Sequence, residues 1–380
     1  MARIVNLPSI FELNTNAFSR RLCSLLLCLL RYSGNSPRAP FRPELLSMSR
    51  SLCSLALVAL AATLLPLPLV RAQSPNITKP VMFDTKEADA IVSRMQIMPK
   101  DNPWNADVSQ WPVAKNSAAM VASIGNDKPL RYNPDMAYIL VPADQPRVDL
   151  KVVEYPDESD KGPFPIPENV PIEGWPANFK RDDDLKKLTL DDVQRDKIDQ
   201  GGDRHAIVVD PVKMMLYEFY QMKKVDGGWQ AACEATFNLQ SNDLRPDGWT
   251  SSDAAGLPIF PAIIRYDELQ AGMVNHAMRV TVRNSRRAYV SPATHYASRK
   301  TDPNLPRMGE RLRLKADYDI SKFSPYVQAI LKGLKKHGML VADNGIEWAL
   351  SCAPDERIPV LHDELRKVKG SAFEVVEAPK

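Results

Sequence analysis

Proline is the residue that most limits how the first half of this chain can fold. Fifteen prolines lie between Ser74 and Phe179. Because proline removes a backbone donor and breaks helices and central strands, long regular elements are not expected there. The stretch still carries large aromatic residues that a disordered tract lacks. We therefore expect residues 73–200 to wrap around a core, with short exceptions at a helix over Lys86–Met95 and a strand over Ala137–Val141.

The pattern changes after Gly201-Gly202, where β-strands are expected. Three runs of strand-forming residues cover His205–Val209, Lys213–Tyr220 and Trp229–Phe237. The turn signal Asp226-Gly227-Gly228 predicts that the last two pair as an antiparallel hairpin. Further strands are expected over Ala277–Val282, Arg287–Val290, Arg311–Leu314, Met339–Val341, Trp348–Ser351 and Phe373–Val376.

Two helices are expected among these strands. The clearer one runs from Ser324 to His337, with Pro325 in its first turn and Gly338 after its end. The shorter one covers His362–Val368. Together these elements predict an α+β, β-rich fold with an antiparallel sheet or sandwich core over 201–380, which forms one globular unit with 73–200.

Residues 48–72 have the order of a secretory signal peptide. A basic start at Met48-Ser49-Arg50 precedes an apolar run, and Val70-Arg71-Ala72 supplies small residues for cleavage. A membrane span is the rival interpretation, but Pro66 and Pro68 interrupt the end of the run. The pattern predicts a secreted or periplasmic protein with no stable membrane span after cleavage.

Residues 1–47 precede this signal and have three interpretations. The simplest is that translation starts at Met48, so that 1–47 is a misassigned leader. Arg20-Arg21 before an apolar stretch also resembles a twin-arginine signal, and the Arg-rich, acid-poor composition is typical of an organelle transit peptide.

Charge and cysteine content narrow the class of protein. Residues 1–72 hold eight Arg, no Lys and two Glu, so their removal changes the net charge from +3 to −3. A slightly acidic chain without a sustained basic run argues against a nucleic-acid partner. Beyond residue 72 only Cys233 and Cys352 remain, and they form either a disulfide or two buried free thiols. Oligomeric state is left open.

Familiar catalytic signatures are missing from the sequence. It contains no Gly-x-Ser-x-Gly elbow, Walker loop, His-Glu-x-x-His or dinucleotide glycine fingerprint, and nothing identifies a cofactor. Polar residues are dense between Asn238 and His295, which predicts a cleft. The candidate site residues are Asp253, Asp267, His276, Arg279, His295 and Asp343.

Several strings resemble a family of uncharacterised secreted bacterial proteins. They are Ala255-Gly256-Leu257-Pro258-Ile259-Phe260-Pro261, Arg265-Tyr266-Asp267-Glu268, His276-Ala277 with Arg279, Ala342-Asp343-Asn344-Gly345, and Gly370-Ser371-Ala372-Phe373-Glu374. The likeness extends over most of the chain after residue 72. It implies export and a shared fold, and it assigns no activity.

Carbohydrate is the ligand class that export and these residue types favour. In a polysaccharide lyase, Arg279 or Asn275 neutralises a uronate carboxylate while His276, His295 or Tyr296 moves the proton. This requires His295 to approach His276, which it does if Asn284-Ser285 turns the chain back along the strand.

A glycoside hydrolase is the second enzymatic alternative. It needs two carboxyl groups, drawn here from Asp253, Asp267, Glu268 and Asp343. Asp267 and Glu268 are expected to point to opposite faces of a strand, and Asp343-Asn344-Gly345 has the sequence of a hairpin turn.

Two further alternatives stay open. His205, His276 and His295 with a carboxylate have the chemistry of a metal site, although their spacing is wide. A carbohydrate-binding or cell-envelope module without catalysis would instead use exposed Trp and Tyr beside polar residues.

Overall fold

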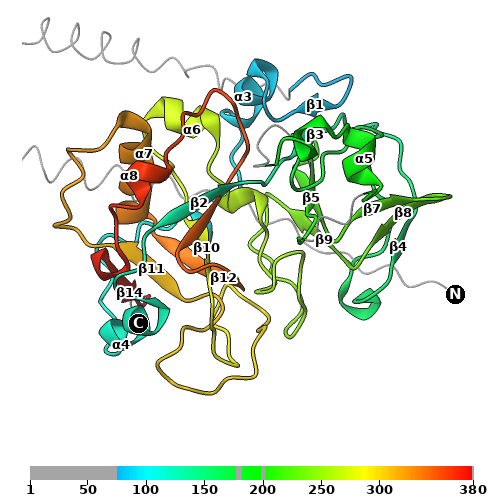
Figure 1. Ribbon diagram of the computed structural model, residues 1–380. Coiled ribbons are helices and arrows are strands. Elements are labelled where there is room, and N and C mark those ends of the chain that lie inside the picture. Colours follow the sequence, from blue (N-terminus) through cyan, green and yellow to red (C-terminus); the bar gives the residue numbers. More distant parts are fainter. Residues whose placement is uncertain (1–74, 177–181, 198–201, 379–380) are drawn as a thin grey trace, which may run out of the picture. The chain divides into compact units, whose positions relative to one another are not determined.

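The computed structural model describes residues 75–176, 182–197 and 202–378. Residues 73–380 form one compact unit. The leader and signal peptide expected over 1–72 lie outside the described residues. Within the described part the fold is α+β and β-rich, with mixed sheets and a few helices (Figure 1).

A five-stranded sheet has the order β1-β3-β5-β6-β9. Its strands are β1 (Val81–Met82), β3 (Ile139–Leu140), β5 (Ala206–Asp210), β6 (Met215–Tyr220) and β9 (Cys233–Asn238). The β5, β6 and β9 strands are antiparallel neighbours, whereas β3 runs parallel to β5. The sheet is therefore mixed, and two of its strands come from the proline-rich region.

The predicted strand over Trp229–Phe237 is divided between two sheets. Its first part, β8 (Gly228–Ala231), pairs with β7 (Lys223–Val225) around the expected turn and with β4 (Leu150–Val152) in a three-stranded sheet. The chain then passes through Ala232 into β9, which pairs with β6. The expected antiparallel pairing forms between β6 and β9, while the turn signal itself joins the smaller hairpin of β7 and β8.

A six-stranded sheet has the order β14-β11-β12-β10-β13-β2. Its strands are β2 (Arg131–Pro134), β10 (Met278–Val282), β11 (Arg311–Leu314), β12 (Met339–Asn344), β13 (Ala349–Cys352) and β14 (Phe373–Val376). The β10 and β12 strands are parallel, and so are β13 and β2. This sheet too is mixed rather than antiparallel.

Two local expectations about this sheet are wrong. Residues Arg287–Val290 form no strand, and Tyr289 makes only an isolated bridge with Met308. The chain cannot return along β10 after Asn284-Ser285, because both edges of β10 are occupied by β12 and β13. For the same reason Asp343-Asn344-Gly345 is no hairpin turn: it carries the chain past the end of β10, where Gly345 N–H donates to the Val282 carbonyl.

The longest described helix matches its prediction closely. The helix α7 (Pro325–Lys336) packs its apolar face on the six-stranded sheet, with Gly333 against Met278 of β10. The other α-helices in the described ranges are α3 (Lys86–Val92), α4 (Ser117–Ile124), α5 (Leu190–Gln194), α6 (Tyr266–Ala271) and α8 (His362–Leu365). Short 3-10 turns cover Pro103–Asn105, Pro156–Glu158, Leu185–Lys187, Phe260–Ala262 and Gly370–Ala372.

The proline-rich region does more than wrap around the core. It supplies β1, β2, β3 and β4, so each of the three sheets contains at least one of its strands. Trp104 and Tyr138 are each only 2% exposed within the main hydrophobic core. Because these strands are two to four residues long, they tolerate the dense prolines that exclude longer elements.

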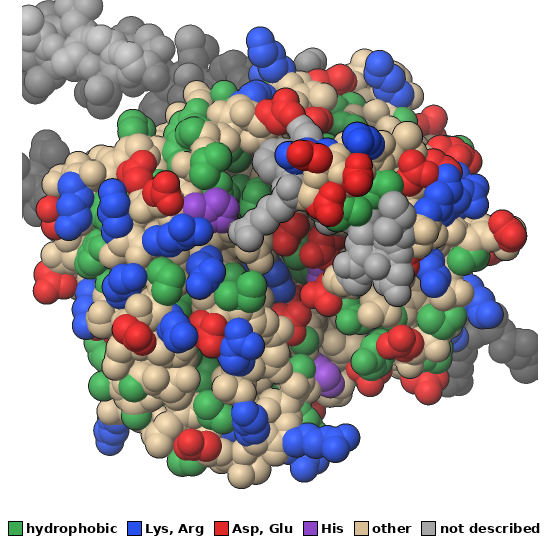
Figure 2. Space-filling model, viewed as in Figure 1, with side chains coloured by type: hydrophobic (Ala, Val, Ile, Leu, Met, Phe, Trp, Pro, Cys, Tyr) green, Lys and Arg blue, Asp and Glu red, His purple; other side chains and the backbone are tan. Residues whose placement is uncertain are grey.

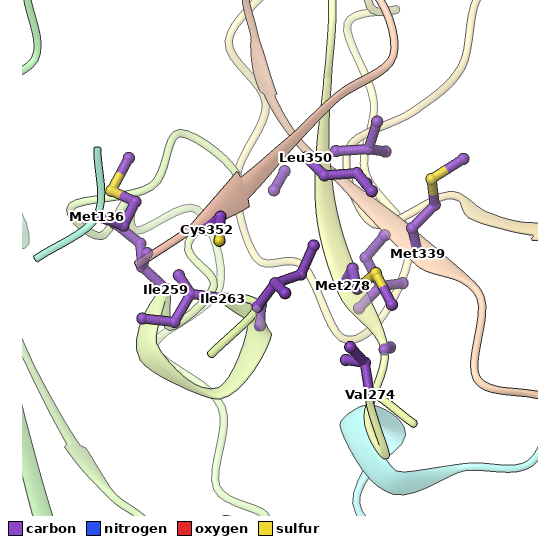
Figure 3. Packing of buried hydrophobic residues seen from close by; sticks show 14 of the residues in the cluster. Met136, Ile259, Ile263, Val274, Met278, Met339, Leu350 and Cys352 are labelled. Carbon is purple, nitrogen blue, oxygen red and sulfur yellow. The ribbon is translucent and has the colours of Figure 1, made fainter. Parts of the chain in front are cut away.

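The core also settles the state of the two cysteines after residue 72. Cys233 lies in β9 and Cys352 in β13, which belong to different sheets, and both are buried free thiols. Figure 3 shows Cys352 among core side chains that include Met136, Ile259 and Ile263. Of the two expected states, the structure has the buried thiols rather than the disulfide.

Candidate functional site

His276 is a buried residue in an ion-pair network at the start of β10. Its Nε2 lies 3.0 Å from Glu268 Oε2, and its Nδ1 lies 2.8 Å from the Ala277 carbonyl. Glu268 also pairs with Arg265, which lies beside Asp267. Asp267 and Glu268 belong to the helix α6 and not to a strand, which corrects the sequence expectation.

His295 lies at the other end of the parallel strands. Its Nδ1 is 2.8 Å from the Ala254 carbonyl, and its ring stacks on Tyr296 with a centroid separation of 5.6 Å. Ala255 N–H bonds to the Ala342 carbonyl near the end of β12, whereas His276 precedes the start of β10. Among the described residues no hydrogen bond or ring contact joins His276 to His295, so the expected histidine pair does not form.

Arg279 and Asp253 are the two predicted site residues that meet directly. The Arg279 Nε and Nη2 donate to the two Asp253 oxygens at 2.9 and 2.8 Å, and Nη1 donates to Ser351 Oγ at 2.6 Å. Asp253 is fully buried and Arg279 is 3% exposed. Burial raises the pKa of Asp253, while the guanidinium opposes that rise. Two N–H donors on the two oxygens of one carboxylate are the usual bidentate geometry of a strong Arg–Asp ion pair.

Asp343 is the third predicted site residue at this location. It lies at the carboxyl end of β12, where its Oδ1 accepts from the Asn344 N–H at 2.6 Å. Burial, with the nearby Asp253 carboxylate, raises the pKa of Asp343 to about 7 even though Arg279 opposes the shift. Unlike Asp253, Asp343 is only partly buried.

Glu173 is a site residue that sequence analysis did not find. It lies in a loop of the proline-rich region, where its Oε2 accepts from the His205 N–H at 3.2 Å at the start of β5. Burial and the Asp135 carboxyl raise the pKa of Glu173 to about 8, against the opposing effects of the His205 N–H and Arg279. Glu173 is also partly buried. No local pattern in the sequence marks it.

Glu218 is a second missed carboxyl group, and it did have a signal. It is fully buried in β6 and accepts hydrogen bonds from the Ile259 and Phe260 N–H groups at 2.9 and 2.8 Å. Burial raises its pKa to about 8, with Asp253 adding to the shift and Arg279 opposing it. A single Glu inside the apolar run Met215–Tyr220 could have been recognised as a buried polar group.

Two more side chains border this group of carboxyls. Burial, with the charge of Arg279, lowers the pKa of His205 to about 3, so its imidazole is neutral near pH 7. Burial raises the pKa of Tyr220 to about 12, and Asp203 and Asp343 add to that shift. The His205 and Tyr220 rings lie 5.7 Å apart.

These contacts define an acidic cluster, made of Glu173, Glu218, Asp253, Asp343 and Arg279. It joins the five-stranded sheet, through β6 and the start of β5, to β10 and β12 of the six-stranded sheet. In the view of Figure 2, acidic side chains gather in a hollow near the middle of the molecular surface. A separate groove of about 660 Å³ lies on the three-stranded sheet, and no predicted site residue lines it.

The described residues offer no metal centre. They contain no group of three or more His, Cys, Asp or Glu side chains placed to hold an ion. His205, His276 and His295 have separate partners, so they do not form the His-rich set that was considered.

The chain was compared with protein-family models, with curated proteins and with solved structures. No family model matches the chain, and neither the curated proteins nor the solved structures yield a significant match. None of the helices in the described ranges is both long and apolar enough to cross a membrane.

Proposed function

We propose that this chain is an exported glycoside hydrolase in which Glu173 and Asp343 act as an acid–base pair. One observation carries the proposal: two partly buried carboxyls, Glu173 in a loop and Asp343 in β12, both feel the charge of Arg279, and their pKa values are raised to about 8 and about 7. Paired carboxyl groups whose environments separate their pKa values are typical of acid–base catalysis. Export rests on the signal pattern over 48–72.

The two carboxyls suit different steps of the reaction. Near pH 7 the Glu173 carboxyl is mainly protonated, so it can donate a proton to the leaving glycosidic oxygen as the bond to the anomeric carbon breaks. Asp343, with the lower pKa, accepts the proton of the water that attacks the same carbon. Solvent then returns both groups to their starting states.

The neighbouring groups support this assignment of roles. Arg279 holds the fully buried Asp253, so Asp253 acts on Asp343 through its charge rather than by contact with substrate. No hydrogen bond joins Glu173 to Asp343 among the described residues, which differs from a carboxyl dyad that shares one proton. Glycosidases keep their two carboxyls roughly 5 to 9 Å apart, with room for the sugar and water.

Activity against a panel of neutral and uronate polysaccharides tests the proposal. The purified protein is compared with Glu173→Gln and Asp343→Asn, which keep side-chain size. We expect new reducing ends without unsaturation, and a loss of roughly 100-fold or more in each variant. Glu154→Gln, at an exposed position, is the matched control and retains full activity.

Two results would contradict the proposed hydrolase. Products with unsaturated ends would indicate the lyase instead, with proton abstraction in place of hydrolysis. Failure to cleave any polymer, in a protein that still binds polysaccharide, would indicate a non-catalytic carbohydrate-binding or envelope protein.

A further inference from the structure

A loop with a strongly positive sequence borders the Asp343 end of the acidic cluster. Residues 283–300, called here the positive loop, contain Arg283, Arg286, Arg287, Arg299 and Lys300 and no acidic residue. The loop follows β10, and Asn344 Nδ2 fixes it to the end of β12 by donating a 2.9 Å hydrogen bond to the Ala297 carbonyl. In Figure 1 it lies in the yellow-to-gold part of the chain, beyond the end of β10.

Most of these cations have no charged partner in the described part of the chain. Arg283 pairs with Glu347 at 2.7 Å, but the other four make no salt bridge to a described residue. The Arg286 Nε is buried without a hydrogen-bond partner among the described residues. Arg287, which is exposed, lies with its guanidinium carbon 5.6 Å from the Tyr296 ring centre. The exposed side chains of Arg287, Arg299 and Lys300 are therefore available to an external anion.

The aromatic residues of the positive loop use their faces within the protein. Tyr296 stacks on His295 at 5.6 Å and on Tyr289 at 6.3 Å, with ring planes 3° and 14° apart. A single-stranded nucleic acid is usually bound by aromatic faces that stack on bases. Here the Tyr296 ring already stacks on two other rings, and its hydroxyl accepts a hydrogen bond from Arg287 Nε at 3.3 Å, so it offers no free platform for a base.

We propose that the positive loop binds the carboxylates of a uronate-containing polysaccharide and directs that polymer into the acidic cluster. This inference rests on the proposed hydrolase and names its substrate class. Guanidinium groups form charge-assisted, often bidentate bonds with carboxylates. Glu173 and Glu218 are mainly neutral near pH 7, so the acidic cluster itself repels such a polymer only weakly.

The test measures binding separately from turnover. The probe is polygalacturonate, titrated into the purified Glu173→Gln protein at two salt concentrations, beside a neutral galactan and a single-stranded RNA. In the same background, Arg287→Gln with Arg299→Gln should weaken polygalacturonate binding by at least about tenfold, as expected for loss of charge-assisted contacts. Higher salt should weaken it as well. The exposed Lys332→Gln on α7 is the control, with less than about twofold change.

Each alternative outcome overturns this inference. Equal binding of galactan and polygalacturonate would mean that charge does not select the polymer. Tighter binding of RNA, lost in the arginine variants, would assign the positive loop to nucleic acid. Unchanged polygalacturonate binding in a folded arginine variant would place the binding surface elsewhere.

The experiments distinguish failure of the proposed binding role of the positive loop from failure of the proposed hydrolase activity. Cleavage of neutral polymers without binding of polygalacturonate would remove the loop's role and leave the hydrolase. Arginine-dependent binding of polygalacturonate without cleavage would remove the hydrolase and leave the binding surface.

Discussion

Arg279 is the residue on which the acidic cluster depends most directly. Its guanidinium is the only cation that bonds to the fully buried Asp253 among the described residues. Arg279→Ala leaves that carboxylate buried without its partner, so we expect a loss of about 3 to 5 kcal/mol in the free energy of unfolding. Urea denaturation measures it.

Arg283→Ala is the matched control for Arg279→Ala. Arg283 follows the same strand and also pairs with a carboxylate, Glu347, but its side chain is 62% exposed. An exposed pair contributes little to stability because water and salt screen it. Equal destabilisation by the two substitutions would show that burial of the Arg279–Asp253 pair is not what matters.

The dependence of activity on pH follows from the two raised pKa values. Below about pH 7 the Asp343 carboxyl gains its proton and ceases to act as a base. Above about pH 8 the Glu173 carboxyl loses the proton that it must donate. We therefore expect kcat/KM to be highest between these values and to fall on both sides.

Substitution can assign each limb of that profile. Asp343→Asn should remove the acid limb from the residual activity, and Glu173→Gln should remove the alkaline limb. Profiles recorded from pH 5 to 10 on one polymer provide the measurement. An optimum near pH 4 to 5, the range of unperturbed carboxyls, is incompatible with the assigned pair.

At the scale of elements, Gly333 fixes how closely α7 approaches β10. A Cβ at this position would lie 2.4 Å from the Val274 carbonyl oxygen and 2.8 Å from Met278 Cε. Helix propensity alone predicts that Gly333→Ala stabilises α7 by about 1 kcal/mol. The backbone contact cannot be relieved by a side-chain rotation, so we expect a net loss of about 1 to 3 kcal/mol instead.

Thermal unfolding compares Gly333→Ala with a neighbouring substitution. Lys332→Ala changes an exposed residue of the same helix and should be neutral or slightly stabilising. If Gly333→Ala raised the melting temperature, α7 would have to move freely away from β10, contrary to the close packing described.

Local patterns predicted the elements and the local pairing of β6 with β9, but not the partners that are remote in sequence. The α7 helix and the strands β5, β6 and β10–β14 follow from periodicity and caps within each segment. The pairing of β9 with β6 was expected, but the pairing of β8 with β4, which lies far away in sequence, was not. A period-two pattern shows which face of a strand is buried, but it does not identify the neighbouring strand.

For the candidate site too, the sequence predicted residue types better than contacts between distant segments. Asp253, Arg279 and Asp343 were predicted by residue type, and the structure brings these three together. His276, Asp267 and His295 were predicted on the same grounds, but their contacts lie elsewhere. Glu173 had no local signal because its pKa depends on burial by segments remote in sequence.

At the scale of the whole molecule, the chain after residue 72 cannot be divided into a core and a dispensable wrapping. In the sheets, β3 pairs with β5, β2 with β13, and β4 with β8. We therefore expect the fragment 201–380 to lack a cooperative unfolding transition, because it loses these strands and exposes the apolar surface that they cover. The fragment 73–380 is the control and should unfold cooperatively, since it is one compact unit. Urea titration followed by near-ultraviolet circular dichroism measures both, and a cooperative transition in 201–380 would restore the wrapping interpretation.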